Sequence, residues 1–335
     1  MTKLKVLSSI PPDSYLNSRN QNIPLEVLLE GFADAKADFY NNREAVWSNL
    51  QKSLEHAHIN HSNIRPTGIV VQGSEITSAI LGEAVEYFSR AFYNFFAQDK
   101  LTEFGYSTWS SITNYYLSFF AIHALLRLQG RCITRIWRQI SRQFYIFPFE
   151  FTDHKYGIIR GKGTTHDLAW DTFYEVYDGF SYTENPYFEY GFKKKYVDRV
   201  DEEIEFRNRI NYEPYQGYEE VWDPSCIAGF INQYENRRFD EGKEVETLSR
   251  LTTELDYRDY ARAALRLIFC HRLLCQIAEK NTKIDVLMGN RKTTLSKFMS
   301  CVNPRAEAHM ITARIIGLMD LGNSNLGDTG RSIPN

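Results

Sequence analysis

Five arginines recur at helical spacing near the middle of the sequence. Successive members are four, four, three and four positions apart, which on one continuous helix places every guanidinium group on the same face. Like charges arranged in this way repel one another unless anions or acidic groups lie opposite, so such a face suits a nucleic-acid backbone or an acidic subunit. The alternative is a solvated face whose arginines each pair with an Asp or Glu elsewhere in the chain. The five are Arg127, Arg131, Arg135, Arg138 and Arg142.

A second set of polar side chains lies in the segment EFRNRINYEPY. Arg207 carries a planar, permanently charged guanidinium group that matches a phosphate, and Asn208 could orient that group or a ribose by hydrogen bonding. Tyr212 follows Arg207 after four intervening residues. An unperturbed tyrosine has a pKa of about 10, against about 6.5 for histidine, so Tyr212 is poorly suited as a general base but can donate a hydrogen bond or act as a general acid. In the alternative interpretation, Arg207 pairs with Glu203 or Glu205 and caps a buried polar cluster.

The segment RGKGTTH places five residues between Arg160 and His166. It differs from a phosphate-binding P-loop, because the lysine precedes the second glycine and no Gly-Lys-Ser/Thr follows. Glycine-rich and flanked by strand-like sequence, it predicts a plain surface turn. The alternative is a mobile basic loop near a ligand.

Two histidine-containing clusters are candidates for metal binding. His56, His58 and His61 lie in a polar segment that contains no cysteine and offers only Glu55 as an acidic ligand. The Cys-His-Cys cluster at 270–275 falls in an apolar helical pattern, which indicates core residues. We therefore predict no metal site and no cofactor.

Composition limits the classes of function. The net charge of −3 excludes a protein that coats nucleic acid through bulk charge, so any phosphate-binding surface must be a local patch. The five cysteines are scattered without a C-x-x-C pair, which favours a reducing compartment over a disulfide framework. The N-terminus lacks the apolar core of a signal peptide, and the longest apolar stretch, 115–126, is too short to span a bilayer. We expect a cytoplasmic protein with no membrane segment.

The hydrophobic pattern predicts a mainly α-helical chain. Residues 1–22 indicate an arm or an irregular lead-in, and residues 69–71 a short strand or a buried connection. Gly130 is expected to stop the third helix, which weakens the continuity of the arginine face. The aromatic and β-branched runs QFYIFPFEF and KYGIIRGKG predict a strand-and-loop insertion at about 143–192. Helices are predicted at 24–56, 75–98, 109–129, 193–211, 244–279 and 304–321.

The segment WSSITNYYLSFFAIHALLRLQG resembles the second helix of many HEPN domains (the higher-eukaryote and prokaryote nucleotide-binding family). Those helices pair a Tyr-Tyr with a Phe three residues later and end in Ala-Leu-Leu and a Gly. The same pattern fits any aromatic core helix. The matching residues are Tyr115, Tyr116, Phe119, Ala124, Leu125, Leu126 and Gly130.

The segment EFRNRINYEPY resembles the second signature of that family, an Arg followed by a polar residue and, four to six positions on, a His. Arg207 and Asn208 match its opening, whereas Tyr212 occupies the histidine position. A subset of the family linked to nucleotidyltransferases also has Tyr there. The resemblance covers about 75–130 and 195–280, and the insertion accounts for the long spacing between the two signatures.

The resemblance implies a HEPN-like helical bundle with a β-containing insertion. Its domains would be an N-terminal helical extension at 1–74, the HEPN-like domain at 75–280, and a C-terminal helix and polar tail at 281–335. The helices at 109–129 and 195–211 would pack side by side, with Tyr115 or Tyr116 near Arg207.

For function, the resemblance implies metal-independent RNA cleavage, in which the ribose 2′-hydroxyl attacks the adjacent phosphate. Arg207, Asn208 and Tyr212 would form the site in a cleft between two copies, and the arginine series would guide the RNA. The setting would be a prokaryotic defence or toxin–antitoxin module with a protein partner encoded nearby. The alternatives are a non-catalytic HEPN scaffold that binds a nucleotide or a partner protein, and a helical protein unrelated to the family.

Overall fold

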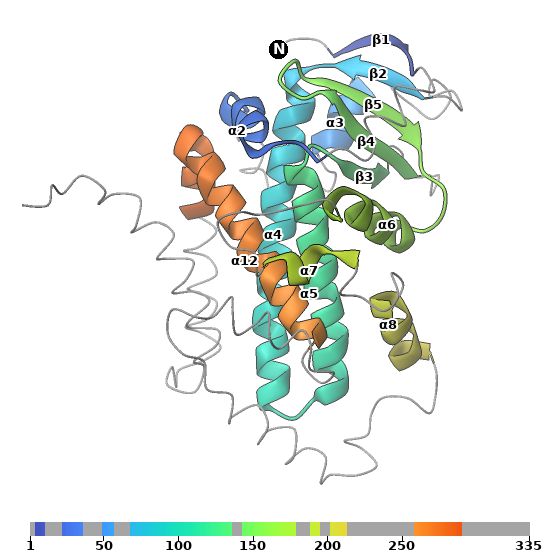
Figure 1. The fold of residues 1–335 in the computed structure, drawn as a ribbon, viewed down its shortest axis with the longest axis vertical. Helices are drawn as coiled ribbons and strands as arrows, with labels where there is room; N and C mark the ends of the chain where they lie inside the picture. Colours follow the sequence, from blue (N-terminus) through green and yellow to red (C-terminus); the bar gives the residue numbers. More distant parts are fainter. Residues whose placement is uncertain are drawn as a thin grey trace, which may run out of the picture.

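Helices predominate in the part of the chain that the structure, a computed structural model, describes (Figure 1). This confirms the predicted mainly α class. The described residues are 4–10, 22–35, 49–56, 68–135, 143–178, 188–194, 202–212 and 258–289.

A long helical hairpin forms the centre of the molecule. Its two helices are α4 (Ser74–Glu103) and α5 (Ser107–Leu128), and Gly105 at φ 78° makes the tight turn between them. The second helix is buried on nearly every side. It contacts α4, α6 (Thr165–Tyr177), α8 (Glu202–Tyr212) and α12 (Arg258–Lys280).

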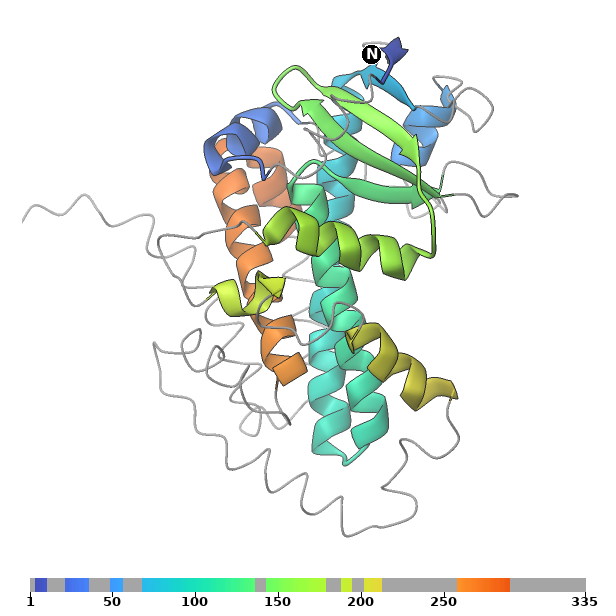
Figure 2. The same cartoon turned by 45° about the vertical axis from the view of Figure 1, so that its right-hand side comes forward.

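A five-stranded antiparallel sheet lies at one end of the hairpin (Figures 1 and 2). Its spatial order is β1-β2-β5-β4-β3, so strands from the N-terminal segment pair with strands that follow the hairpin. The predicted extension at 1–74 and the predicted domain at 75–280 therefore share one sheet. The strands are β1 (Lys5–Ser9), β2 (Ile69–Gln72), β3 (Cys132–Arg135), β4 (Gln143–Glu150) and β5 (Lys155–Arg160).

The remaining helices pack around this framework. Helix α12 lies against α4 and α5 and also contacts α2 (Leu25–Ala33) and the single turn α7 (Glu189–Phe192). Inside it, Arg266 is buried and donates hydrogen bonds to the carbonyl oxygen of Gly191, to Ser118 and to Tyr174. Helix α3 (Asn49–His56) contacts α4. None of the helices within the described ranges is both long and apolar enough to cross a bilayer.

The expected elements agree with this fold in part. The strand at 69–71, the paired strands after residue 143 and the helices at 75–98 and 109–129 are confirmed. The insertion was wrongly expected to lack helices, because α6 begins at Thr165. The lead-in contains β1, which was not expected. Parts of the helices predicted at 24–56, 193–211 and 244–279, and all of that at 304–321, lie outside the described residues.

Candidate functional site around Arg207

Residues of the two signature segments meet where α8 crosses α5. Arg207 donates a hydrogen bond from Nη2 to the hydroxyl of Tyr116 at 3.2 Å and another from Nη1 to Oδ1 of Asn208 at 2.7 Å. Its guanidinium carbon lies 5.8 Å from the ring centre of Tyr115 and 5.9 Å from that of Tyr116. The predicted packing of these helices, with the tyrosine pair near Arg207, is therefore confirmed. Two hydrogen bonds and two aromatic rings hold a half-buried positive charge in place.

Tyr212 is the last residue of α8. Its side chain lies outside the described part of the structure, so its role in the site stays a prediction. Arg207 and Asn208 are the predicted site residues that the structure brings together.

A histidine that the sequence did not assign to this site lies beside it. Nδ1 of His166, in the first turn of α6, is 2.5 Å from the hydroxyl oxygen of Tyr115. The imidazole also stacks on Phe119, with 4.4 Å between the ring centres. Tyr115 therefore contacts His166 through its hydroxyl group and Arg207 through its ring.

The electrostatics of His166 reflect this neighbourhood. Partial burial lowers the pKa of its imidazole, the positive charge of Arg207 lowers it further, and Asp167 opposes the shift. His166 is therefore neutral at neutral pH. A neutral imidazole can accept a proton, and the charge of Arg207 beside it makes this imidazole a weaker base than a free histidine.

The turn before α6 sets the position of His166. Thr164 and Asp167 form a reciprocal capping box, in which the Asp167 N–H donates to Oγ1 of Thr164 and the Thr164 N–H donates to Oδ2 of Asp167, each at 3.2 Å. Gly163 precedes it at φ 95°. The interpretation of RGKGTTH as a plain surface turn was therefore incomplete. Arg160 ends β5, residues 161–163 form the turn, and Thr165 and His166 begin a helix that faces the site.

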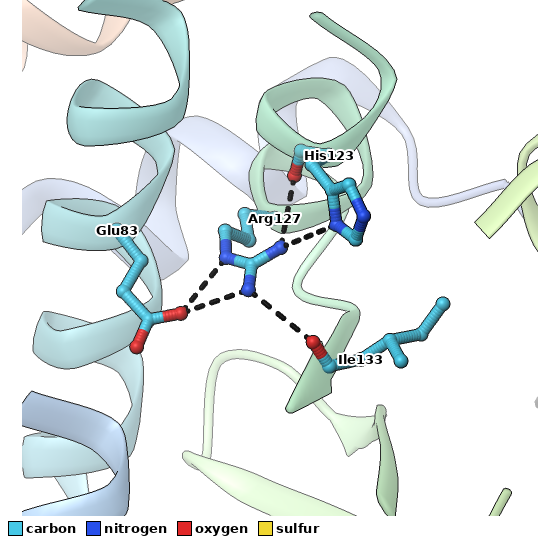
Figure 3. Close-up of polar contacts among 4 residues, drawn as sticks. All are labelled: Glu83, His123, Arg127 and Ile133. Atoms are coloured by element: carbon cyan, nitrogen blue, oxygen red, sulfur yellow. Dashed lines mark hydrogen bonds and ion pairs between the residues drawn. The ribbon is translucent and has the colours of Figure 1, made fainter. Parts of the chain in front are cut away.

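A deeper polar cluster joins α4, α5 and β3 (Figure 3). Nε and Nη2 of Arg127 each lie 2.9 Å from Oε2 of Glu83. Nη1 donates to the carbonyl oxygen of His123 at 3.2 Å and lies 3.1 Å from its Nδ1, and Nη2 reaches the carbonyl oxygen of Ile133 at 3.5 Å. The ring of Tyr87 lies 4.1 Å from the guanidinium carbon. These contacts tie the hairpin to the first strand after it.

His123 connects this buried cluster with the site. Burial lowers the pKa of its imidazole well below the usual value, and the charges of Arg127 and His166 lower it further. Phe119 packs between the two histidines, edge-on to His123 with ring centres 4.5 Å apart. His123 is therefore a neutral hydrogen-bond partner within the core.

The predicted continuous arginine face is wrong. Helix α5 ends at Leu128, and the chain turns at Gly130, whose φ of 67° favours glycine. A side chain there would also collide with Phe151, because an added Cβ would lie 2.4 Å from its ring. The next residues form β3 instead of another helical turn.

Two members of the series consequently lie in the interior. Arg127 and Arg131 are each 1% exposed, the former paired with Glu83 and the latter donating to the carbonyl oxygen of Gln129. Neither can form an RNA-binding surface. The side chain of Arg135, at the end of β3, and all of Arg138 and Arg142 lie outside the described residues, so their part stays a prediction.

Among the described residues there is no group of three or more His, Cys, Asp or Glu side chains arranged to hold a metal ion. The side chain of His56 and residues 58 and 61 lie outside that part of the chain. Cys270 and His271 are buried in α12, as predicted for core residues. Cys275 is half-buried, and its sulfur lies 3.5 Å from Nε2 of His271.

The fold and site define a mainly α protein with a small antiparallel sheet and an arginine–tyrosine–histidine cluster where three helices meet. No family model matches the chain, and no curated protein or solved structure shows significant similarity to it.

Proposed function

We propose that the site around Arg207 binds the phosphate backbone of RNA. In this proposal the protein is a HEPN-like RNA-binding or metal-independent ribonuclease-like component of a prokaryotic defence or toxin–antitoxin module. The observation that supports it is the contact of Arg207 with Tyr115 and Tyr116, since these residues come from two motifs that are distant in sequence.

The arrangement around Arg207 is suited to a phosphate. A guanidinium group is permanently charged and matches a phosphate in shape, and here it is held before any ligand arrives. Because Tyr116 and Asn208 fix its orientation, little conformational entropy remains to be lost on binding. In cleavage, the same charge would stabilise the phosphate as the ribose 2′-hydroxyl attacks it.

Binding tests use Arg207→Ala and a matched control, Arg209→Ala, which removes an exposed arginine from the same helix. Affinity for a short mixed-sequence single-stranded RNA would be measured by fluorescence anisotropy in EDTA. A charged hydrogen-bonding partner contributes about 1.5–3 kcal/mol, so loss of Arg207 should weaken binding at least about 10-fold, whereas loss of Arg209 should change it little. Equal effects of the two substitutions on RNA affinity would contradict a phosphate-binding role for Arg207.

The second candidate is a non-catalytic scaffold that binds a nucleotide or a partner protein. Tyrosine at position 212 favours it, because a tyrosine of ordinary pKa is a poor base at neutral pH. Cleavage assays with Tyr212→Phe and Tyr212→His separate the candidates. A large loss with Phe indicates a role for the hydroxyl group. If the wild type binds RNA but does not cleave it, and Tyr212→His does not cleave it either, the scaffold is the better interpretation.

We also propose a homodimer, since the resemblance implies a site between two copies of the chain. Sedimentation velocity over a range of concentrations would measure it, and a monomer throughout that range would contradict it. For the biological setting, a nucleotidyltransferase, nuclease, helicase or reverse transcriptase encoded next door would each point to a different module.

A further inference from the structure

We propose that His166 is the proton acceptor of the site, taking the proton of the attacking ribose 2′-hydroxyl while Arg207 holds the phosphate. This inference rests on the proposed function and adds a residue to it. It supplies an imidazole to a site whose motif carries tyrosine at position 212.

The geometry supports the assignment through one shared side chain. The hydroxyl group of Tyr115 lies 2.5 Å from Nδ1 of His166, and the ring of the same tyrosine lies 5.8 Å from the guanidinium carbon of Arg207. One tyrosine side chain thus separates a fixed positive charge from an imidazole. The charge of Arg207 also acts on the imidazole of His166, so the two groups lie near each other.

In this proposal, Nδ1 of His166 is the donor in its contact with the hydroxyl oxygen of Tyr115. When Nδ1–H donates to the tyrosine oxygen, Nε2 keeps its lone pair and can accept a proton. The capping box and the stack on Phe119 hold the ring in place. This is the arrangement that a general base requires, a positioned imidazole whose second nitrogen is oriented by another group.

Burial and the positive charge of Arg207 on α8 keep His166 neutral, and Asp167 on its own helix is the opposing acid. The other titratable groups beside it are Tyr115, its hydrogen-bond partner on α5, and His123 on the same helix. An imidazole that is already neutral at neutral pH can accept a proton without first losing one. Its usefulness as a base should decline only on acidification.

The step balances as a transesterification. Nε2 of His166 takes the proton from the 2′-hydroxyl, the 2′-oxygen forms a bond to phosphorus, and the bond from phosphorus to the 5′-oxygen breaks. The departing 5′-oxygen takes a proton from water, and the imidazolium returns its proton to the resulting hydroxide. The products are a 2′,3′-cyclic phosphate and a 5′-hydroxyl end, with no net oxidation or reduction.

The variant that tests this role is His166→Asn. Asparagine can place a hydrogen-bonding group near the position of Nδ1, but its amide cannot accept a proton at neutral pH. His154→Asn is the matched control, because His154 is also half-buried, lies in the turn between β4 and β5 at φ 55°, and asparagine tolerates that conformation. Thermal unfolding followed by circular dichroism establishes that both variants are folded.

Three measurements are made on the full-length chain in EDTA. The first is affinity for a 2′-O-methyl RNA, which cannot react, and the second is the rate of cleavage of the unmodified RNA of the same sequence. The third is titration of His166 by nuclear magnetic resonance. His166→Asn should bind nearly as well as the wild type but cleave about 100-fold or more slowly, while His154→Asn should do both normally. The wild-type rate should rise with pH at the titration midpoint of His166. That midpoint should move upward in Arg207→Gln, because a positive charge has been removed.

The outcomes separate this inference from the proposed function. If His166→Asn cleaves as fast as the wild type, the role of His166 is wrong and the RNA site at Arg207 stands. If the wild type binds RNA but does not cleave it, the proton-transfer role is also wrong and the scaffold is preferred. If binding does not depend on Arg207, the proposed function itself fails.

Discussion

The hydroxyl oxygen of Tyr115 lies 2.5 Å from Nδ1 of His166, although 51 positions separate the two residues in the sequence. This contact joins the helix that follows the sheet to the centre of the hairpin. Because Arg207 lies over the ring of the same tyrosine, α5, α6 and α8 meet at one side chain. Substitutions on any of the three helices should therefore affect the site through Tyr115.

The two adjacent tyrosines should have separable roles. Tyr115→Phe removes the partner of His166 but keeps the ring under Arg207, so it should destabilise the fold by about 1 kcal/mol and leave RNA affinity nearly unchanged. Tyr116→Phe removes the oxygen that accepts from Arg207, so it should weaken RNA binding by up to about 10-fold. Urea unfolding and anisotropy measure the two effects. Identical profiles for the two variants would contradict the assignment.

The buried pair of Glu83 and Arg127 should be essential to the fold but replaceable as a unit. Glu83→Gln leaves a buried guanidinium group without its counter-charge and should cost about 3 kcal/mol in urea unfolding, because the desolvation of the arginine is no longer offset. Glu83→Gln combined with Arg127→Met should recover much of that loss. The exposed Glu150 pairs with Lys155, and Glu150→Gln should leave the urea midpoint nearly unchanged.

A double variant that loses as much as the two single changes added together would contradict this interpretation. It would mean that the two side chains contribute independently, through packing instead of through their pairing.

The sequence predicted the hairpin because its apolar residues recur with helical period, and the two motifs anticipated the contact between Arg207 and Tyr116. It failed at α6, where aromatic composition favoured strands. Trp170, Phe173, Tyr174 and Tyr177 follow helical spacing, so that signal was present. The arginine face failed because spacing cannot reveal that a chain reverses at one glycine. His166 was missed because only tertiary packing brings it to Tyr115.

Gly130, which follows the end of α5, should be costly to replace. Gly130→Ala combines a backbone φ of 67° with a Cβ only 2.4 Å from the ring of Phe151, so strain and steric overlap add. We expect a loss of about 2 kcal/mol or more in urea unfolding. Gly163→Ala is the control, since φ is 95° there but the nearest atom lies 3.8 Å from an added Cβ. Its loss should be smaller, and equal losses would show that overlap with Phe151 is unimportant.

Stability should fall on mild acidification because of His123. Its pKa is lower in the folded protein than the unfolded value of about 6.5, so below that pH the unfolded chain binds the extra proton and the folded state does not. The contribution is complete above pH 6.5 and is lost as the pH falls toward the folded pKa, at up to about 1.4 kcal/mol per pH unit. Urea midpoints at neutral and mildly acidic pH measure it. His123→Gln has no side chain that titrates in this range and should lose less stability on acidification than the wild type. A wild type and a His123→Gln variant with the same pH dependence would show that His123 is not the residue whose protonation opposes folding.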